Sequence, residues 1–292
     1  MNGCSFIFML KLIKTAELRG IRMITKKKFT EERINGVHLG KGTLTFQNIT
    51  LNVYSFSIDG VIIDTGAKSL EKGFADFFKK QDADFCVITH YHEDHTGNAR
   101  ILQEEMKLPI YMDSQKIDYC KTKADYPLYR KLFWGKRPPF EAKPTGKTFT
   151  SRSAVWKVIE TPGHSPDHLA FLNHETGQLF AGDLYVTPKP KVILDEEHIP
   201  TTIESLKKIL AYPFEDVFCS HAGYVQDGRK ALQRKLEYLL ELQHTVLRLY
   251  NEGFSPKQIT NQLFPKKFPI INVSLGEWDS KHLVYSILQG LT

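Results

Sequence analysis

Residues that commonly bind metal ions are concentrated in one short segment, HYHEDHTG, which spans residues 90–97. This segment follows a buried-type strand pattern, FCVIT, and precedes a helical pattern. In an extended chain His90 and His92 point to the same side, so both can reach one ion. Asp94 and His95, where the chain turns into the helix, can reach a second ion. Imidazole and carboxylate ligands favour zinc, manganese or iron over calcium. A chance group of surface histidines is the weaker explanation, because the cluster stands at the end of a strand.

Four further motifs contain residues of the same types. They are Asp64 in VIIDTG, His164 in TPGHSPDH, Asp183 in FAGD and His221 in CSHAG. Together with the H-x-H-x-D-H run, these motifs resemble the metallo-β-lactamase superfamily over roughly residues 39–224. Five motifs in the order that this family uses make the resemblance specific. It implies an α/β fold, the αββα sandwich, in which two mixed β-sheets are flanked by helices.

The resemblance also implies two divalent metal ions, zinc first, with iron and manganese as alternatives. One ion would be held by three histidines, namely His90, His92 and His164. The second ion would be held by Asp94, His95 and His221. Asp183 would bridge the two ions. Asp64 would fix the loop that presents the ligands without touching the metal itself.

The implied chemistry is hydrolysis by a metal-dependent enzyme. Two ions about 3.5–4 Å apart lower the pKa of a bridging water from 15.7 to about 7. The resulting hydroxide would attack the carbonyl of a small-molecule ester, thioester or lactone, and Asp94 would orient it and pass its proton to the leaving group. Tyr185 and Tyr224 follow Asp183 and His221 closely enough to be candidates for contacting the oxygen of the intermediate, although most tyrosines in such loops only pack.

The substrate is left open between several classes. A phosphodiesterase or ribonuclease is the first alternative, because basic and aromatic residues alternate in the segment 113–149 and such patterns can bind single-stranded RNA. Only 38 positions separate Asp183 from His221, which leaves no room for the large inserted domain of the RNA-processing branch. A true β-lactamase comes next, and a non-catalytic metal-binding module is a further alternative, expected to have lost ligands. The segment 113–149 is either a lid over the site or a solvated loop with a basic face.

Composition and charge set broader limits. The 292 residues carry a formal net charge of +6, which favours the approach of an anionic substrate. We therefore expect a small-molecule partner that is anionic or has an apolar group, with nucleic acid as the second choice. The four cysteines are scattered, which predicts reduced thiols and a cytoplasmic protein. The short apolar run near the N-terminus predicts neither an export signal nor a membrane span.

The elements that must position these residues can be read from hydrophobic periodicity. Strands are expected near residues 42–49, 51–58, 61–66, 85–89, 109–112, 154–160 and 216–220. A hairpin turning at HETG is expected within 168–183. Helices are expected at 68–80, 97–106, 203–210 and 228–251, with another starting at Ser255-Pro256. We predict an extension or overlong start at 1–22, a catalytic domain at 23–225 and a helical C-terminal region at 226–292, in a monomer or homodimer.

Overall fold

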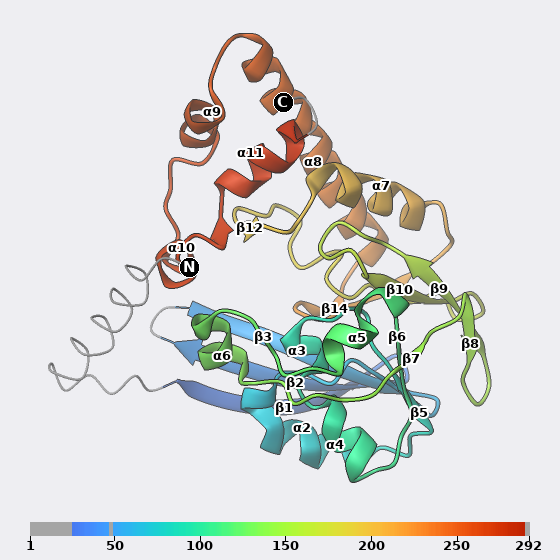
Figure 1. The fold of residues 1–292 in the computed structure, drawn as a ribbon. Helices are drawn as coiled ribbons and strands as arrows, with labels where there is room; N and C mark the ends of the chain where they lie inside the picture. Colours follow the sequence, from blue (N-terminus) through green and yellow to red (C-terminus); the bar gives the residue numbers. More distant parts are fainter. Residues whose placement is uncertain (1–24, 47–48, 290–292) are drawn as a thin grey trace, which may run out of the picture.

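A computed structural model describes residues 25–46 and 49–289 of the chain. The extension predicted at residues 1–22 lies outside the described residues. Two main β-sheets, with helices on their outer faces, make up most of the described structure (Figure 1). This is the predicted αββα sandwich, and a helical C-terminal region follows it, also as predicted.

The first sheet has seven strands within the described residues, and they are ordered as in the chain. They are β1 (Lys26–Ile34), β2 (Val37–Phe46), β3 (Ile49–Ile58), β4 (Val61–Ile63), β5 (Phe85–Val87), β6 (Ile110–Met112) and β7 (Lys143–Pro144). Strands β1 to β4 are antiparallel, and β4 to β7 are parallel. The helical segments that accompany this sheet are η1 (Lys68–Leu70), α2 (Glu71–Phe78), α3 (Glu93–Thr96) and α4 (Ala99–Glu104).

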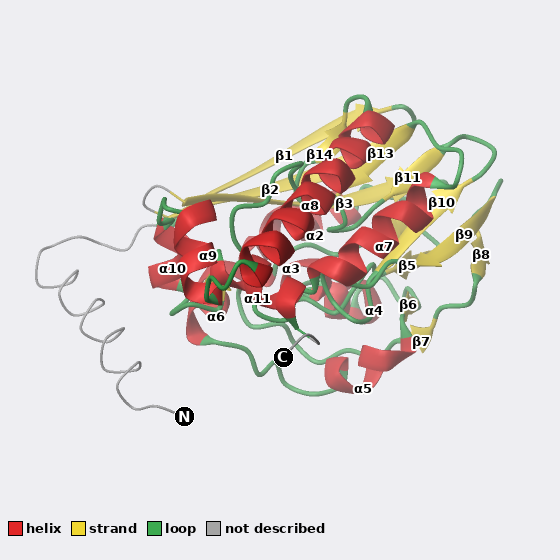
Figure 2. Cartoon of the chain, turned by 90° about the horizontal axis from the view of Figure 1, so that it is seen from above, coloured by secondary structure: helices red, strands yellow, loops and turns green. Residues whose placement is uncertain are grey.

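The second sheet has the order β14-β13-β11-β10-β9-β8 in the described part of the chain. Its strands are β8 (Thr148–Thr150), β9 (Val155–Glu160), β10 (Leu169–Asn173), β11 (Gln178–Phe180), β13 (Asp216–Cys219) and β14 (Gly223–Val225). The predicted hairpin is formed by β10 and β11. Helices α7 (Ile199–Leu210) and α8 (Gly228–Asn251) lie across this sheet, as Figure 2 shows from above.

Alternating side chains of the strands build three apolar layers. Between the sheets, Phe56 and Ile63 of the first sheet pack in one cluster with Phe171 and Phe218 of the second. The alternate residues point outward; Ile62, for example, packs among the phenylalanines of α2. Because side chains of a strand alternate between its two faces, each strand can supply two cores at once.

The C-terminal region shares its core with the second sheet rather than standing apart. Leu232 and Leu239 of α8 lie in one buried cluster with Leu172 of β10 and Val217 of β13. Helix α8 has the bounds predicted from its leucine pattern, and α9 (Pro256–Leu263) starts at a capping box made by Ser255. The chain continues through α10 (Pro269–Val273), β15 (Trp278–Asp279) and α11 (Lys281–Leu288), and β15 pairs with β12 (Ile193–Leu194). The domain boundary near residue 225 stays a prediction.

Several parts of the structure were missing from the sequence-based expectations, among them strands β1, β12, β14 and β15 and the short helices within 113–149. Strand β1 was not predicted, because its run of charged side chains hides any apolar alternation; such charges are typical of an edge strand, which must avoid pairing with other chains. The segment 113–149 contains three short helical segments, η2 (Ser114–Lys116), α5 (Ile117–Cys120) and α6 (Leu128–Trp134). Helix α6 packs against η1, near the ligand-bearing loops.

Candidate metal centre

The seven predicted ligands come from four loops at one edge of the two sheets. The first loop follows β5, which is parallel to β4, so that the residues after these two strands are neighbours. The backbone N–H of Asp64 accordingly donates to Val87 O, and that of Thr65 donates to His95 O. Strands β11 and β13 are also parallel, and Asp183 and His221 follow their carboxyl ends. His164 lies in the turn between β9 and β10.

The turn that carries His164 is held close to α7. Gly163 has a φ of +131°, a conformation that side chains rarely adopt, and a Cβ at this position would collide with Thr202 of α7. Its carbonyl accepts a hydrogen bond from the N–H of His198, the N-cap residue of α7. The glycine of the TPGH motif thus lets the loop approach the helix and fixes the place of His164.

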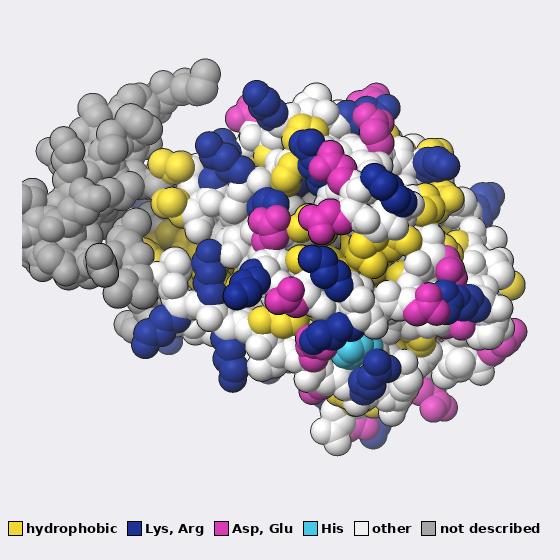
Figure 3. Space-filling view, turned by 90° about the horizontal axis from the view of Figure 1, so that it is seen from below, with side chains coloured by type: hydrophobic (Ala, Val, Ile, Leu, Met, Phe, Trp, Pro, Cys, Tyr) yellow, Lys and Arg dark blue, Asp and Glu magenta, His cyan; other side chains and the backbone are white. Residues whose placement is uncertain are grey.

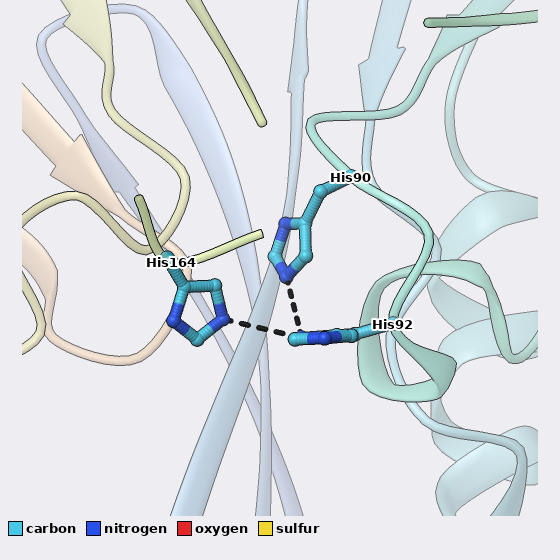
Figure 4. A group of neighbouring side chains, drawn as sticks. All are labelled: His90, His92 and His164. Carbon is cyan, nitrogen blue, oxygen red and sulfur yellow. Dashed lines mark hydrogen bonds between the residues drawn. The ribbon is translucent and has the colours of Figure 1, made fainter. Parts of the chain in front are cut away.

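Three histidines converge on one point, as Figure 4 shows. His90 Nε2 lies 3.0 Å from His92 Nδ1, and His164 Nε2 lies 3.1 Å from the same atom. Nitrogen ligands of a tetrahedral zinc ion, with zinc–nitrogen distances of 2.0–2.1 Å, stand about 3.3 Å apart. The three rings are therefore arranged as a set of ligands that could hold one metal ion.

A second group is formed by Asp94, His95 and His221. His221 Nε2 lies 3.4 Å from Asp94 Oδ2, and His95 Nε2 lies 3.9 Å from Asp94 Oδ1. This group, too, could hold a metal ion.

Asp183 stands between the two groups. Its Oδ2 atom lies 3.3 Å from His164 Nε2 in the first group. The same oxygen lies 3.0 Å from His221 Nε2 and 3.6 Å from His95 Nε2 in the second. One carboxylate thus touches ligands of both groups, as a bridging residue must.

Two buried atoms of the centre lack the partners that buried polar atoms normally have. Within the described residues, neither His95 Nε2 nor Asp183 Oδ1 has a hydrogen-bond partner. His95 and Asp183 are almost completely buried. Orphaned nitrogen and oxygen atoms in a ring of possible ligands fit a cation that would take up their lone pairs.

The electrostatics of the site also suit bound cations. Burial, together with repulsion from neighbouring histidines, keeps the pKa of His90 well below its ordinary value, so its ring is neutral and able to bind a metal. Burial alone would lower the pKa of His221, but the Asp183 carboxylate outweighs it and raises that pKa to about 9. Burial alone would raise the pKa of Asp183, but His221 and His95 hold it well below its usual range. The Asp183 carboxylate therefore favours positive charge beside His221 and His95, and a bound cation would supply that charge.

Asp64 lies behind the ligands, as expected. Its Oδ2 lies 2.7 Å from His95 Nδ1 and accepts a hydrogen bond from the Ser220 hydroxyl. Its Oδ1 accepts the backbone N–H of Thr89, the residue before His90. Asp64 is fully buried, with a φ of +56°. One carboxylate thus contacts two of the four loops that carry ligands, since Thr89 and His95 lie in the loop after β5 and Ser220 precedes His221.

Sequence reasoning missed two glutamates that contact the ligand histidines. Glu196 Oε1 lies 2.7 Å from His92 Nε2, and Glu197 Oε2 lies 3.2 Å from His164 Nδ1. A carboxylate on the far nitrogen of a metal-binding histidine fixes its orientation and raises its basicity. These glutamates stand between β12 and α7, in a segment with no motif or periodicity, so no local pattern pointed to them.

His168 is a third residue whose importance was missed. It matches no ligand position in the sequence motifs. The structure buries it, and its Nε2 accepts the backbone N–H of Asp183, while its Nδ1 lies 2.8 Å from the Thr161 hydroxyl. It therefore fixes the backbone at the residue between the two groups.

A cavity opens beside the two groups of ligands. His92, Asp94, His164, Asp183 and His221 form one part of its wall. Much of the remaining wall is apolar, and it includes Trp134 of α6, Ile193 of β12, Leu239 of α8 and Trp278 of β15. Helix α6 thus supplies a wall of the cavity, which favours the lid interpretation of that part of segment 113–149.

The two tyrosines predicted as catalytic candidates are not brought to this cavity. The Tyr224 hydroxyl donates to Asp216 Oδ1, at the beginning of β13, whereas His221 follows the end of that strand. Tyr185 packs against the core cluster beneath the C-terminal helices. Neither side chain lines the cavity wall, so we assign neither a catalytic role. Both tyrosines were selected on sequence distance alone, which does not fix side-chain direction.

Comparisons with known proteins agree with this arrangement. The model of the metallo-beta-lactamase superfamily matches residues 53–221, more than half of the chain. A beta-lactamase-like protein 2 homolog of Caenorhabditis elegans is 22% identical over 230 residues, which cover 76% of this chain and 73% of that protein. An atrochrysone carboxyl ACP thioesterase of Passalora fulva is 25% identical over 256 residues, covering 85% of this chain and 67% of that one.

Solved structures show the same fold. A metallo-beta-lactamase family protein of Thermus thermophilus superposes with a TM-score of 0.64 at 17% identity, over 88% of this chain and 94% of that one. No helix in the described part of this chain is long and apolar enough to cross a membrane. From its motifs, its fold and the matching family model, the chain belongs to the metallo-beta-lactamase superfamily and is a hydrolase.

Proposed function

We propose that this protein is a binuclear metal-dependent hydrolase that cleaves a thioester or ester of a small molecule. The observation that carries the proposal is the position of Asp183, whose Oδ2 atom contacts a histidine of each candidate ligand group. His90, His92 and His164 would hold one ion, and Asp94, His95 and His221 the other, with Asp183 shared. Zinc suits these ligands best, since imidazole and carboxylate are its usual ligands after thiolate.

When bound, two divalent ions would supply a water of lowered pKa as nucleophile and would polarise the carbonyl to be attacked. The protein's own groups would do the rest. Asp94 stands beside the ring of His221, where its free lone pairs could hold the attacking water and carry its proton to the leaving thiol or alcohol. Glu196 and Glu197 would keep the rings of His92 and His164 in place throughout.

The thioester and ester class is supported by the relatives and by the cavity. One relative, at 25% identity over 256 aligned residues, is named as an atrochrysone carboxyl ACP thioesterase. The apolar wall of the cavity, with Ile193, Leu239 and Trp278, suits the hydrocarbon part of an acyl group.

The ribonuclease alternative has less support. On the face shown in Figure 3, lysine and arginine side chains are interspersed with aspartate and glutamate rather than gathered in one stripe. A nucleic-acid backbone is normally bound by a continuous basic surface. In the cavity itself, the guanidinium of Arg130 is already paired with Glu93 and Glu277, so among the described lining residues only Lys235 would remain to bind a phosphate.

The test joins metal analysis to a substrate panel. Protein purified without added metal would be assayed for bound metal by elemental analysis, and for hydrolysis of thioesters, esters, lactones, phosphodiesters and β-lactams. About two equivalents of metal per chain, with thioester or ester cleavage that is lost on chelation and restored by zinc, is the expected result. Full activity with only one equivalent of metal per chain would refute the binuclear centre. Activity on phosphodiesters alone, lost on chelation and restored by metal, would refute the substrate class.

A further inference from the structure

Lys235 extends from α8 into the cavity beside the candidate metal centre. The residue is only 7% exposed, although lysines are rarely buried unless they are paired. Its Nζ donates hydrogen bonds to the carbonyl oxygens of Leu184 and Tyr185, each at 2.8 Å. These two residues directly follow Asp183, so the ammonium group lies next to the loop that carries the shared ligand.

The ammonium group of Lys235 has one donor left. A lysine ammonium has three N–H donors, and the two carbonyls use two of them. Among the residues that the structure describes, no carboxylate lies within ion-pairing distance of this group, whereas Arg130 in the same cavity wall pairs with two glutamates. Burial lowers the pKa of Lys235, and the Glu197 and Asp183 carboxylates oppose this from beyond ion-pairing distance. An anionic ligand in the cavity would give the buried ammonium group a direct counter-ion.

The surroundings of Lys235 indicate which part of a substrate would carry the anion. Leu239, one helical turn further along α8, and Ile199 of α7 line the same cavity and are almost fully buried. Because the side chains beside Lys235 are apolar and buried, this part of the cavity suits the hydrocarbon chain of an acyl group better than a polar leaving group.

We infer that Lys235 is a binding residue for a carboxylate on the acyl part of the substrate. The substrate class is then a half-thioester or half-ester of a dicarboxylic acid, whose methylene chain lies along the apolar wall. Hydrolysis of such a compound rests on the proposed function, but binding of its carboxylate by Lys235 does not. Lys235 would select the substrate and would take no part in bond cleavage.

Binding of the reaction products tests the inference without relying on turnover. Succinate, glutarate and adipate would be titrated calorimetrically into the zinc-loaded protein, each beside the monocarboxylate of equal length: butyrate, valerate and hexanoate. Both members of a pair present one carboxylate to the metal centre, so only the second carboxylate reports on Lys235. For at least one pair we expect about 10- to 100-fold tighter binding of the dicarboxylate, as is typical of a charge-assisted hydrogen bond.

Variants of Lys235 test whether this residue causes the preference for dicarboxylates. Lys235→Met should abolish the preference, and Lys235→Arg should retain part of it. Lys230→Met is the matched control, because Lys230 is an exposed lysine on the same helix. Metal content and melting temperature would be recorded for each variant. If Lys235→Met does not fold, Lys235→Arg and the wild-type comparison remain, and equal affinities within every pair in the wild type would still overturn the inference.

The same acid pairs, converted to thioesters of N-acetylcysteamine, test whether Lys235 also selects the substrate during catalysis. Wild type should cleave the carboxyacyl thioester with the higher kcat/KM, mainly through a lower KM, and Lys235→Met should lose this ratio. Equal affinities within each pair, or a preference that survives in Lys235→Met, would overturn the inference. If no thioester or ester is cleaved but dicarboxylates still bind through Lys235, the proposed function fails and the carboxylate site stands.

Discussion

Glu93 and Arg130 form a bidentate ion pair in which both nitrogen–oxygen distances are 2.7 Å. Glu93 directly precedes Asp94 in the ligand segment, and Arg130 lies on α6. The same guanidinium donates to Glu277 Oε1 at 3.0 Å, in the C-terminal region. All three side chains are largely buried. One arginine thus holds together the ligand loop, the helix over the cavity and the segment that leads to β15.

Replacing Arg130 should be strongly destabilising. In Arg130→Met two buried carboxylates would lose their partner, and such a loss costs about 3–5 kcal/mol of the free energy of unfolding. Urea denaturation of metal-loaded protein would measure it. Arg152→Met is the control, since Arg152 pairs with Asp82 and Asp84 at the exposed surface, where ion pairs contribute little to stability. Similar losses in both variants would contradict the view that Arg130 joins these segments.

Glu197→Gln should weaken metal binding while leaving the ligands themselves intact. Glu197 contacts His164 on the nitrogen that faces away from the other ligands, and removing such a partner typically costs about 10- to 100-fold in metal affinity. Competition with a chromophoric chelator would measure the change. Glu204→Gln on the exposed face of α7 should behave as wild type. An unchanged zinc affinity in Glu197→Gln would show that this glutamate does not support the centre.

Loss of the shared ligand should abolish activity without unfolding the protein. Asp183→Asn removes the charge that lies between the two groups of ligands, and we expect at least about 100-fold lower kcat/KM together with a reduced metal content. His90→Ala should have the same effect through the first group. Circular dichroism would check the fold, and elemental analysis the bound metal. Turnover at the wild-type rate in either variant, with contaminating metal excluded, would refute the mechanism.

The stability of metal-stripped protein should fall as the pH rises from about 6.5 to 9. The pKa of His221 is raised from 6.5 to about 9 by Asp183, so its protonated ring stabilises the fold fully below 6.5 and ceases to do so above 9. The raised pKa values of His95 and His164 act in the same direction.

Metal affinity should change the opposite way over the same interval, because a metal ion must displace these protons. Thermal unfolding of the stripped protein and zinc titration at several pH values would measure both trends. A stability that rises between pH 6.5 and 9 would contradict the assignment of these histidines as protonated.

Much of the ligand arrangement could be foreseen from the sequence, since its residues stand at the ends of recognisable strands. His90 and His92 alternate with Tyr91 in an extended segment, and their ring nitrogens do meet, 3.0 Å apart. The leucine spacing of α8 predicted its bounds because that spacing is long and regular. In both cases the information is local, so neighbouring residues were sufficient to read it.

Lys235 and Glu196 could not be foreseen, because their roles depend on distant parts of the chain. On an amphipathic helix a lysine is normally taken for the solvent face, and only the approach of the Leu184 and Tyr185 carbonyls shows otherwise. Glu196 meets His92 across 104 positions of sequence. Tyr224 shows the converse case, since it is close to His221 in sequence and yet its hydroxyl donates to Asp216.

The cavity wall combines Trp278 of the C-terminal region with His92 and Asp94, which precede residue 100. Because ribosomes synthesise proteins from the N-terminus, His92 and Asp94 emerge long before the residues that enclose them. The candidate centre can therefore be enclosed only after the C-terminal region has been synthesised. A nascent chain stalled at about residue 225 would already contain every ligand, but neither Lys235 nor Trp278. The residues that we expect to select the substrate would thus be synthesised after the ligands.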